Sequence, residues 1–351
     1  MEALMIKAED LQQYYPFNKI KVKFYPLLLS ELEFFDKQKG EQLYTINRPA
    51  ENTKYLTKGV VKVVTDKGRE KVIKSTSLQS KYPIGDANKS NTMDAIIASA
   101  QASCFQISST LLDHFQVWSG CYDQAPEDSP IRGHQSYEWV VGLLKSQSVQ
   151  MLPQGNVGEL FEALESRTVT AGEEIIAEGD AGDYCYIIAD GEAEVFQCVA
   201  EGEQKIANLG KGVLFGESAL VSSEPRNASI RMKTDGLLMQ LSGEKFSKLL
   251  KAHVVRWITA QTAIEKIANG AILLDVREEE EFAHQGLQGS INIPVTQLRK
   301  KISRLDLTKE VITCSNLGSR CASAAFTLAT LGYDVYALQG GISGLIRSLD
   351  I

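Results

Sequence analysis

The pattern of apolar and polar positions divides the chain into two β-rich stretches and a C-terminal stretch of a different kind. Short β-rich runs broken by Gly, Asp and Asn fill residues 39–64 and again residues 171–196, a pattern typical of a compact barrel or roll. A segment with helical apolar spacing follows each of them, at 108–118 and at 242–257. The pattern therefore predicts one β-roll module that occurs twice.

The spacing of the glycines supports this internal repeat. Gly40 and Gly172 are 132 positions apart, and so are Gly59 and Gly191. Self-similarity at a fixed offset indicates that both stretches share one architecture. The segment between the two copies is polar and contains two prolines, which predicts a linker at 121–145.

Beyond residue 257 the pattern changes to an alternation of strands and helices. AILLDV, EVITC and DVYAL are predicted strands, and SRCASAAFTLATLGY between the last two is a predicted helix. Such alternation implies an α/β domain with a parallel sheet. The predicted fold class is multidomain, with two β-roll (jelly-roll-like, α+β) modules followed by an α/β domain. The expected boundaries are 1–120 for the first roll, 121–145 for the linker, 146–256 for the second roll and 257–351 for the α/β domain.

Composition narrows the class of protein. The chain has 44% hydrophobic and 23% charged residues, as soluble globular proteins do. It contains no run of about 20 apolar residues that could span a bilayer. The N-terminal segment MEALMIKAEDLQQYY lacks the apolar core of a signal peptide. We therefore expect a cytoplasmic protein with no membrane partner.

The distribution of charge, cysteine and histidine argues against nucleic-acid binding, a metal site and a disulfide framework. Residues 1–145 hold 18 Lys and Arg against 17 Asp and Glu, so residues 146–351 carry a net charge of −8. An acidic surface argues against direct nucleic-acid binding. The six cysteines form no CxxC motif and the four histidines show no i,i+4 spacing. We therefore expect neither a metal site nor a disulfide framework.

Residues 214–230, LFGESALVSSEPRNASI, hold the most complete set of binding groups. A cyclic nucleotide presents a singly charged phosphodiester, a ribose 2′-hydroxyl and a base. The phosphate needs converging N–H groups and a guanidinium, and the ribose needs a carboxylate acceptor. Gly216 lets the backbone approach closely, Glu217 can accept from the ribose, and Arg226 can pair with the phosphate. This order of residues predicts a cyclic nucleotide site.

The same segment resembles the cassette of cyclic-nucleotide-binding domains, where FGE(L)AL and PR(A)A are separated by the same four residues. The resemblance covers most of 150–250 and implies an eight-stranded roll, with Glu217 on the ribose and Arg226 on the phosphate. The ligand-binding residues expected here are Phe215, Gly216, Glu217, Ser218, Ala219, Arg226, Asn227 and Ala228. The residues leave the choice of base open, and cyclic AMP is expected ahead of cyclic GMP. The alternative is a roll that kept its scaffold and lost its ligand.

The first roll lacks part of this cassette. The corresponding stretch reads YPIGDANKSNTMDAIIASAQAS, with Asp86 in the glutamate position and no Pro-Arg pair. Burying a cyclic phosphate without a cation would cost several kcal/mol. Lys89 is the nearby cation that could substitute. We therefore interpret residues 1–120 as a degenerate copy that is structural or binds protein partners.

The C-terminal domain resembles rhodanese domains over about 260–346. The residues at that family's spacing are Asp275, Arg277, Glu281, Gly289, Asn292 and Pro294, and GYDVYALQGGISGL resembles its closing strand and turn. Two positions depart from the family pattern. The usual Gly-His is Gln285-Gly286, and the usual Trp after the final glycines is Leu345.

The catalytic loop of this resemblance has a displaced cysteine. Rhodanese chemistry needs a thiolate before a helix N-terminus to carry a persulfide, in a loop of roughly Cys-x-x-Gly-x-Arg-Ser. Counting back from Gly318 and Arg320 without a gap places Ser315 at the nucleophile position. Cys314 reaches that position only if the loop holds one extra residue. Both registers are open, and we favour an inactive or altered domain.

As a whole, the chain resembles a bacterial fusion of tandem cyclic-nucleotide-binding domains, of the cyclic AMP receptor type, with a C-terminal rhodanese-like domain. The first hypothesis is a regulatory sensor in signal transduction, in which bound nucleotide repositions the helix at 242–257 against the rhodanese-like domain. The second is a nucleotide-regulated sulfurtransferase that uses Cys314 and Arg320, with Ser315 as nucleophile position in the other register. The third is a transcriptional regulator without its own helix-turn-helix. A homodimer is compatible with each of them.

Overall fold

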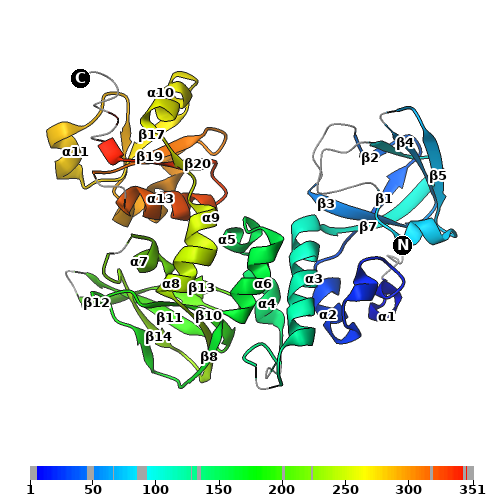
Figure 1. The fold of residues 1–351 in the computed structure, drawn as a ribbon, viewed down its shortest axis with the longest axis horizontal. Coiled ribbons are helices and arrows are strands. Elements are labelled where there is room, and N and C mark those ends of the chain that lie inside the picture. The colour runs from blue at the N-terminus through cyan, green and yellow to red at the C-terminus, as the bar shows by residue number, and fades with distance from the viewer. Residues whose placement is uncertain are drawn as a thin grey trace. The chain divides into compact units, whose positions relative to one another are not determined.

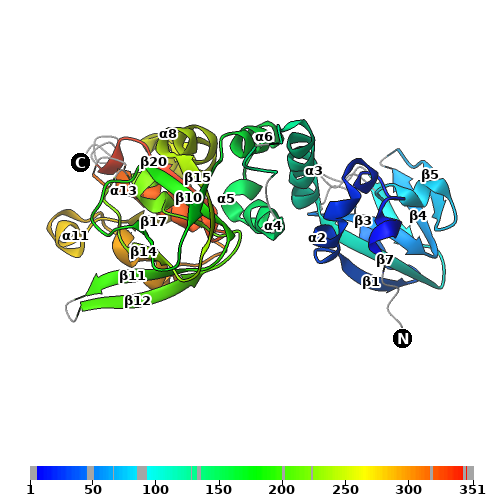
Figure 2. The same cartoon turned by 90° about the horizontal axis from the view of Figure 1, so that it is seen from below.

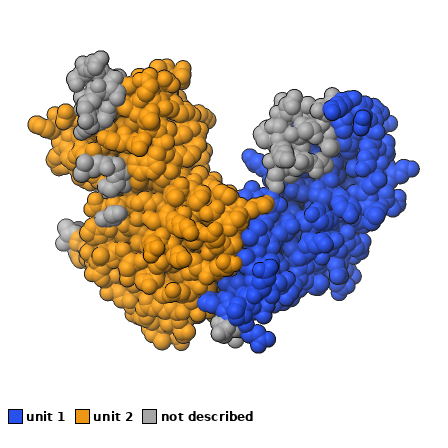
Figure 3. Space-filling view, viewed as in Figure 1, with its two compact units in different colours: residues 1–137 blue, residues 138–351 orange. Residues whose placement is uncertain are grey.

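The computed structural model describes residues 6–45, 51–65, 67–84, 93–127, 129–132, 136–199, 202–222, 224–316, 319–342 and 345. The chain divides into two compact units, residues 1–137 and 138–351, which Figure 3 colours separately. None of the helices in the described residues is both long enough and apolar enough to cross a bilayer.

The first unit contains a roll of two antiparallel sheets, with strand orders β1-β7-β3 and β2-β6-β4-β5. Its strands are β1 (Glu33–Gln38), β2 (Gln42–Tyr44), β3 (Asn52–Lys58), β4 (Val60–Thr65), β5 (Glu70–Lys74), β6 (Met93–Ile97) and β7 (Gln101–Ser108). Alternate apolar side chains such as Leu56, Val61 and Ile97 are buried between the sheets.

Short helices flank this roll. They are α1 (Ala8–Leu11), α2 (Tyr25–Leu29), α3 (Ser109–Gln124) and the 3-10 turns η1 (Phe17–Lys19), η2 (Val22–Phe24) and η3 (Leu78–Lys81). The hydroxyl of Ser108 caps α3 by accepting from the Leu111 N–H at 3.3 Å. Along α3, Phe115 and Trp118 are fully buried and contact Phe24.

The linker predicted at 121–145 is too long. α3 extends to Gln124, and α4 (Glu138–Lys145) begins at Glu138. The apolar positions of EWVVGLLK bury Trp139, Val140 and Leu144, so this segment gains more by forming a helix than by staying extended. The prolines that indicated a linker lie in the segment between the two helices.

The second unit begins with another roll of two sheets (Figures 1 and 2). Its strand order repeats that described for the first roll, with β13 as an additional strand. Its sheets are β13-β10-β15-β8 and β12-β11-β14-β9. The starts of β8, β9 and β10 lie 132 residues after those of β1, β2 and β3, the offset of the glycines. The strands are β8 (Glu165–Val169), β9 (Glu174–Ile176), β10 (Tyr184–Asp190), β11 (Ala193–Val199), β12 (Gly202–Leu209), β13 (Leu214–Phe215), β14 (Ser229–Met232) and β15 (Gly236–Ser242).

The helices of this roll are α4, α5 (Gln147–Gln150), α6 (Gln154–Glu162), α7 (Glu217–Ser222), α8 (Gly243–Phe246), the π-helical turn η4 (Ser247–Lys251) and α9 (Ala252–Val254). The helix predicted at 242–257 therefore ends at Val254, and Trp257 lies in a strand. Ser242 caps its start by accepting from the Lys245 N–H at 3.5 Å.

The second unit ends in an α/β domain with the parallel sheet β16-β20-β19-β17-β18. Its elements are β16 (Trp257–Ile258), α10 (Ala260–Ala268), β17 (Ile272–Asp275), α11 (Glu279–Gln285), β18 (Ile291–Asn292), η5 (Val295–Gln297), α12 (Leu298–Lys301), η6 (Ile302–Arg304), β19 (Val311–Cys314), α13 (Ser319–Thr330) and β20 (Val335–Leu338). The side chains of β19 are all buried, as expected for a central parallel strand.

The α/β domain packs against the second roll through α13. This helix lies along α7, which is the helix of the predicted nucleotide cassette (Figure 1). Phe326 of α13 also contacts Phe246 of α8, with ring centroids 5.8 Å apart. Both α7 and α8 of the second roll therefore contact α13, the helix that follows Cys314 in the sequence.

Candidate functional site: the cassette and the loop facing it

The cassette begins where β13 turns into α7. Phe215 pairs with Tyr186 of β10, and their rings stack with centroids 5.4 Å apart. Phe215 is buried at 4% exposure, so it fixes the start of the turn rather than facing solvent. The next residue, Gly216, has a φ of +79°, which glycine adopts without strain. The chain can therefore reverse at once and start α7 at Glu217.

Gly216 is also required by its neighbours. A Cβ at this position would lie 2.8 Å from Cδ1 of Ile176 and 3.1 Å from Nη1 of Arg226. The backbone thus passes directly over the arginine that was predicted to bind the phosphate. The main chain at Gly216 and the guanidinium of Arg226 are therefore in direct contact.

Replacing Gly216 by alanine should weaken cyclic nucleotide binding at least about ten-fold, because the new methyl group displaces Arg226 as well as straining the backbone. Gly172→Ala is the matched control, since Gly172 has a similar φ of +82° and a methyl group there would meet nothing within 4 Å. It should cost only the backbone strain of about 1–2 kcal/mol. Calorimetric titration and thermal unfolding of both variants measure the difference. Equal loss of affinity in the two variants would refute this role of Gly216.

Arg226 is buried, at 6% exposure, and its guanidinium is held by the protein. Nη1 donates to the carbonyl of Gly216 at 2.6 Å, and Nη2 donates to the carbonyl of Tyr184 at 2.7 Å. Nη2 also approaches the carboxylate of Asp183 at 3.2 Å, whose side chain is 72% exposed. The cation is therefore fixed at the start of α7.

The other predicted cassette residues occupy both sides of α7. Glu217 and Ser218 are half-buried, with the Ser218 hydroxyl 3.4 Å from Oε1 of Glu217. Ala219 is buried against Gly182. Asn227 is exposed, and Ala228 is half-buried. The structure thus brings Phe215, Gly216, Glu217, Ser218, Ala219 and Arg226 together at one turn, with Asn227 and Ala228 directly after the arginine.

The predicted residues of the first roll cannot be placed. Asp86 and Lys89 lie outside the described residues, as does Gly318, from which the loop register of the C-terminal domain was counted.

Cys314 is the last residue of β19, and its side chain is fully buried. Burial raises the pKa of the Cys314 thiol well above its usual range, and the nearby charge of Asp275 raises it further. A thiol in such surroundings stays protonated, whereas the thiolate is the nucleophile. Ser315 is the first loop residue, and its Oγ accepts from the Cys321 N–H at 3.3 Å.

A network of charged side chains holds the loop that follows β19. Asp275 and Arg277 form a buried ion pair, with Nη2 of Arg277 2.7 Å from Oδ2 of Asp275. Arg277 also donates to Oδ1 of Asn316 at 3.1 Å, and Asn316 donates to Glu281 at 2.8 Å. The guanidinium of Arg320 binds both carboxylate oxygens of Glu281, at 2.5 and 2.9 Å, and lowers the pKa of Glu281 to about 2. Both arginines of the predicted rhodanese-like motif are therefore already paired.

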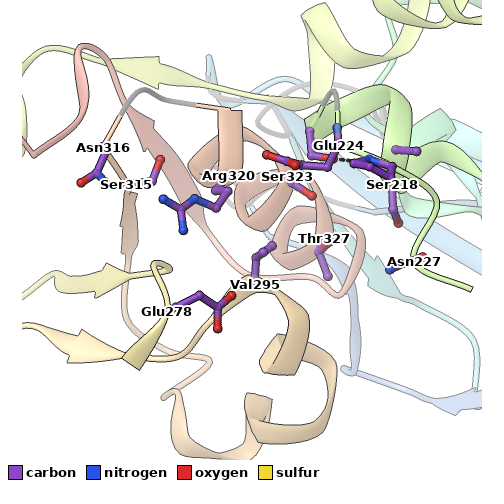
Figure 4. Close-up of a pocket in the computed structure, with 13 residues that line it drawn as sticks. Ser218, Glu224, Asn227, Glu278, Val295, Ser315, Asn316, Arg320, Ser323 and Thr327 are labelled. Carbon is purple, nitrogen blue, oxygen red and sulfur yellow. Dashed lines mark hydrogen bonds between the residues drawn. The ribbon is translucent and has the colours of Figure 1, made fainter. Parts of the chain in front are cut away.

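Sequence reasoning missed a cavity of about 550 Å³ between the cassette and this loop (Figure 4). Ser218, Glu224 and Asn227 line it from the roll, and Asn316, Arg320 and Ser323 line it from the α/β domain. The two groups are about a hundred positions apart and share no motif, so nothing in the sequence indicated their proximity. Within the described part of the chain, no cluster of three or more His, Cys, Asp or Glu could hold a metal ion.

Comparison with known families agrees with the two resemblances. Residues 166–253 match the family described as "Cyclic nucleotide-binding domain", and residues 259–348 match "Rhodanese-like domain". Both matches begin after the first roll, so its assignment as a related module rests on its strand order.

Two curated relatives are fungal cAMP-dependent protein kinase regulatory subunits. That of Emericella nidulans is 41% identical over 93 residues, 26% of this chain and 22% of the relative. That of Colletotrichum orbiculare is 33% identical over 127 residues, 36% of this chain and 32% of the relative. The chain thus spans at most about a third of either relative. These fungal relatives do not support the bacterial origin expected from the sequence.

We also compared the chain with solved structures. The structure of cAMP-bound PfPKA-R (141–441) is 20% identical, covers 69% of this chain and 81% of that chain, and has a TM-score of 0.30. A likeness at that TM-score carries no argument about the arrangement of domains. The family matches, together with the cassette geometry, lead to one conclusion: the chain carries a cyclic nucleotide-binding domain followed by a rhodanese-like domain.

Proposed function

We propose that this protein is a regulatory sensor that binds cyclic AMP in its second roll. The observation that carries the proposal is the position of Arg226, whose buried guanidinium is fixed by two backbone carbonyls at the start of α7. A buried cation gains free energy from a monoanionic phosphodiester, because charge-assisted hydrogen bonds are strong where water is excluded. Glu217, at the first position of α7, is the acceptor for the ribose hydroxyl.

The names of the curated relatives favour cyclic AMP over cyclic GMP, because both proteins are described as cAMP-dependent. The chain's own residues leave the base open. Thermal unfolding of the full chain with each nucleotide tests the proposal. Cyclic AMP should raise the unfolding temperature of the second roll more than cyclic GMP does at the same concentration. No shift with either nucleotide would contradict the proposal.

The first roll is, in this proposal, a degenerate copy of the same module. The recurring strand order and the offset of 132 residues support common architecture. Its sequence has no arginine at the cassette position. We therefore assign it a structural or protein-binding role in the cytoplasm, without a nucleotide of its own.

The rhodanese-like domain is, in this proposal, an output domain without sulfurtransferase activity. Its cysteine is buried in β19, and the gapless register places Ser315 at the first loop position. A serine hydroxyl cannot form a persulfide. No observation favours the alternative of a sulfurtransferase that uses Cys314.

Ser315→Cys should therefore introduce only a weak thiosulfate-to-cyanide activity, absent from the wild-type protein, because it places a thiol before the N-terminus of α13, which favours a thiolate although position 315 is buried. Cys314→Ser serves as the matched variant one position earlier and should show no activity. Turnover assayed as thiocyanate release measures both. Wild-type turnover that Cys314→Ser abolishes would instead establish the enlarged loop with Cys314 as nucleophile.

A further inference from the structure

The cavity between α7 and α13 has the size of a small-molecule site. Its volume of about 550 Å³ lies within the range of roughly 300–1,000 Å³ that ligand pockets usually have. Hydroxyl and amide side chains form much of its wall, including Asn227 from the roll and Ser323 and Thr327 from α13. Figure 4 shows these side chains around the space. Such a wall suits a ligand with several hydrogen-bonding groups.

The charges around this cavity are mainly negative. The terminal nitrogens of Arg320 are both bound to Glu281. The pairing with Glu281 raises the pKa of Arg320, and the charges of Glu278 and Glu224 raise it further. Three carboxylates therefore surround one guanidinium, which leaves a net charge of −2. Glu224 comes from the roll and Glu278 from the α/β domain, so the negative charge spans the contact between them.

The negative charge of this wall favours cationic ligands over anionic ones. Thiosulfate and other oxyanions would meet two carboxylates that no further cation among the described wall residues compensates, and like charges repel by several kcal/mol at short range. A cation of the same size would be attracted by the same two groups. The wall beside the rhodanese-like loop thus has the opposite charge preference from a site for an anionic sulfur donor.

A second feature also points to a ligand. Ser323 is buried at 6% exposure and lines the cavity. In the described part of the chain its hydroxyl has no hydrogen-bond partner, unlike that of Ser222, which donates to the Ser218 carbonyl at 2.9 Å. The Ser323 hydroxyl is open to the cavity. It is therefore available to hydrogen-bond to a polar ligand there.

We propose that the space between α7 and α13 is a second ligand site, and that it binds a small organic cation. In this arrangement an amine or guanidinium group lies between Glu224 and Glu278, and a hydrogen-bonding group of the ligand reaches Ser323. Ser218, Ala219 and Asn227 belong both to the wall of this site and to the cyclic nucleotide cassette, whereas Glu278, Arg320 and Ser323 belong to this site alone. The rhodanese-like domain thereby takes part in binding without any need for a nucleophilic cysteine.

Titration calorimetry of the full chain with agmatine and with putrescine, at physiological salt, tests this proposal. At least one of these cations should bind at one site per chain, and thiosulfate should bind at least about ten-fold more weakly. Glu278→Gln and Glu224→Gln should each weaken binding at least about five-fold, equivalent to about 1 kcal/mol. Ser323→Ala should weaken it by a smaller factor.

Two controls test whether the Glu278→Gln variant is folded and whether the cation is merely attracted to acidic surface residues. Glu278 caps α11 through its side-chain oxygen, and glutamine keeps such an oxygen, so the variant should fold. Glu244→Gln removes an exposed carboxylate of α8 and should leave the affinity unchanged. Cyclic AMP affinity should be the same in Glu278→Gln and the wild type. The proposal is overturned if neither cation binds at millimolar concentration, if thiosulfate binds as tightly as the better of the two cations, or if Glu244→Gln weakens binding as much as Glu278→Gln.

Discussion

Arg226→Lys should weaken cyclic AMP binding about 100-fold or more, a loss of about 2.7 kcal/mol, and Arg226→Ala should remove it. The guanidinium of Arg226 reaches the carbonyls of Gly216 and Tyr184 with two different nitrogens. A lysine ammonium keeps the positive charge but lacks the planar fork that serves several acceptors at once. The Arg226→Lys variant therefore keeps a positive charge, but this charge is no longer fixed in place by the two carbonyls.

The matched control lies five residues further along the chain. Arg231 of β14 has a side chain that is 34% exposed, with ion pairs to Glu174 and Glu203 at the surface. Arg231→Lys should leave the cyclic AMP affinity unchanged, because exposed pairs contribute little. Thermal unfolding without ligand identifies any loss caused by misfolding, since unsatisfied carbonyls at Gly216 and Tyr184 cost about 1–3 kcal/mol each. Arg226→Lys that is folded and binds within about three-fold of the wild type would contradict the assigned role.

Asp275→Asn should lower the free energy of unfolding of the rhodanese-like domain by about 3–5 kcal/mol, because it leaves Arg277 as a buried charge without its partner. Asp275 and Arg277 are 0% and 3% exposed, and Arg277 also holds Asn316 of the loop. Breaking the pair should therefore also loosen the loop that follows β19. Urea unfolding followed by hydrogen exchange of the β17 and β19 amides measures the change in that domain alone.

Glu192→Gln provides the comparison for an exposed pair. Glu192 binds Lys233 at 2.6 Å, with side chains 53% and 49% exposed, so its loss should cost less than about 1 kcal/mol. Replacing both Asp275 and Arg277 by uncharged residues should recover much of the stability, because no buried charge then remains. A cost for Asp275→Asn as small as that for Glu192→Gln would show that the buried pair is not important for folding.

The repeat could be predicted from the sequence because its glycines occur at turns that require a positive φ. Gly40, Gly59, Gly172 and Gly191 have φ between +82° and +99°, where other residues are strained. Each therefore marks a turn that the roll needs at a fixed position. The alternation of strands and helices after residue 257 was equally informative, because the run VITC carries no charged side chain and fits a central parallel strand.

Only part of the contact between the second roll and the rhodanese-like domain could be predicted. We expected the helix at 242–257 to connect the nucleotide site with the rhodanese-like domain, and Phe246 of that segment does contact Phe326. The structure adds a second contact between the domains, because α7 itself packs on α13. Contacts of this kind depend on the shapes of two folded surfaces, and no periodicity in either sequence records them. The cavity beside Arg320 was missed for the same reason.

The loop register was left open by the sequence for another reason. Counting positions cannot tell whether Cys314 belongs to the strand or to the loop. In the structure Cys314 is the last residue of β19, and all four side chains of this strand are buried.

The number of cyclic AMP molecules bound per chain decides whether the second roll is the nucleotide sensor. Calorimetric titration of the full chain should give one site, because the second roll has Arg226 and the first roll has no arginine at the same position of its sequence. The heat should vanish in Arg226→Ala and persist in Arg231→Lys. Absence of binding, two sites per chain, or a single site that survives Arg226→Ala would refute this assignment.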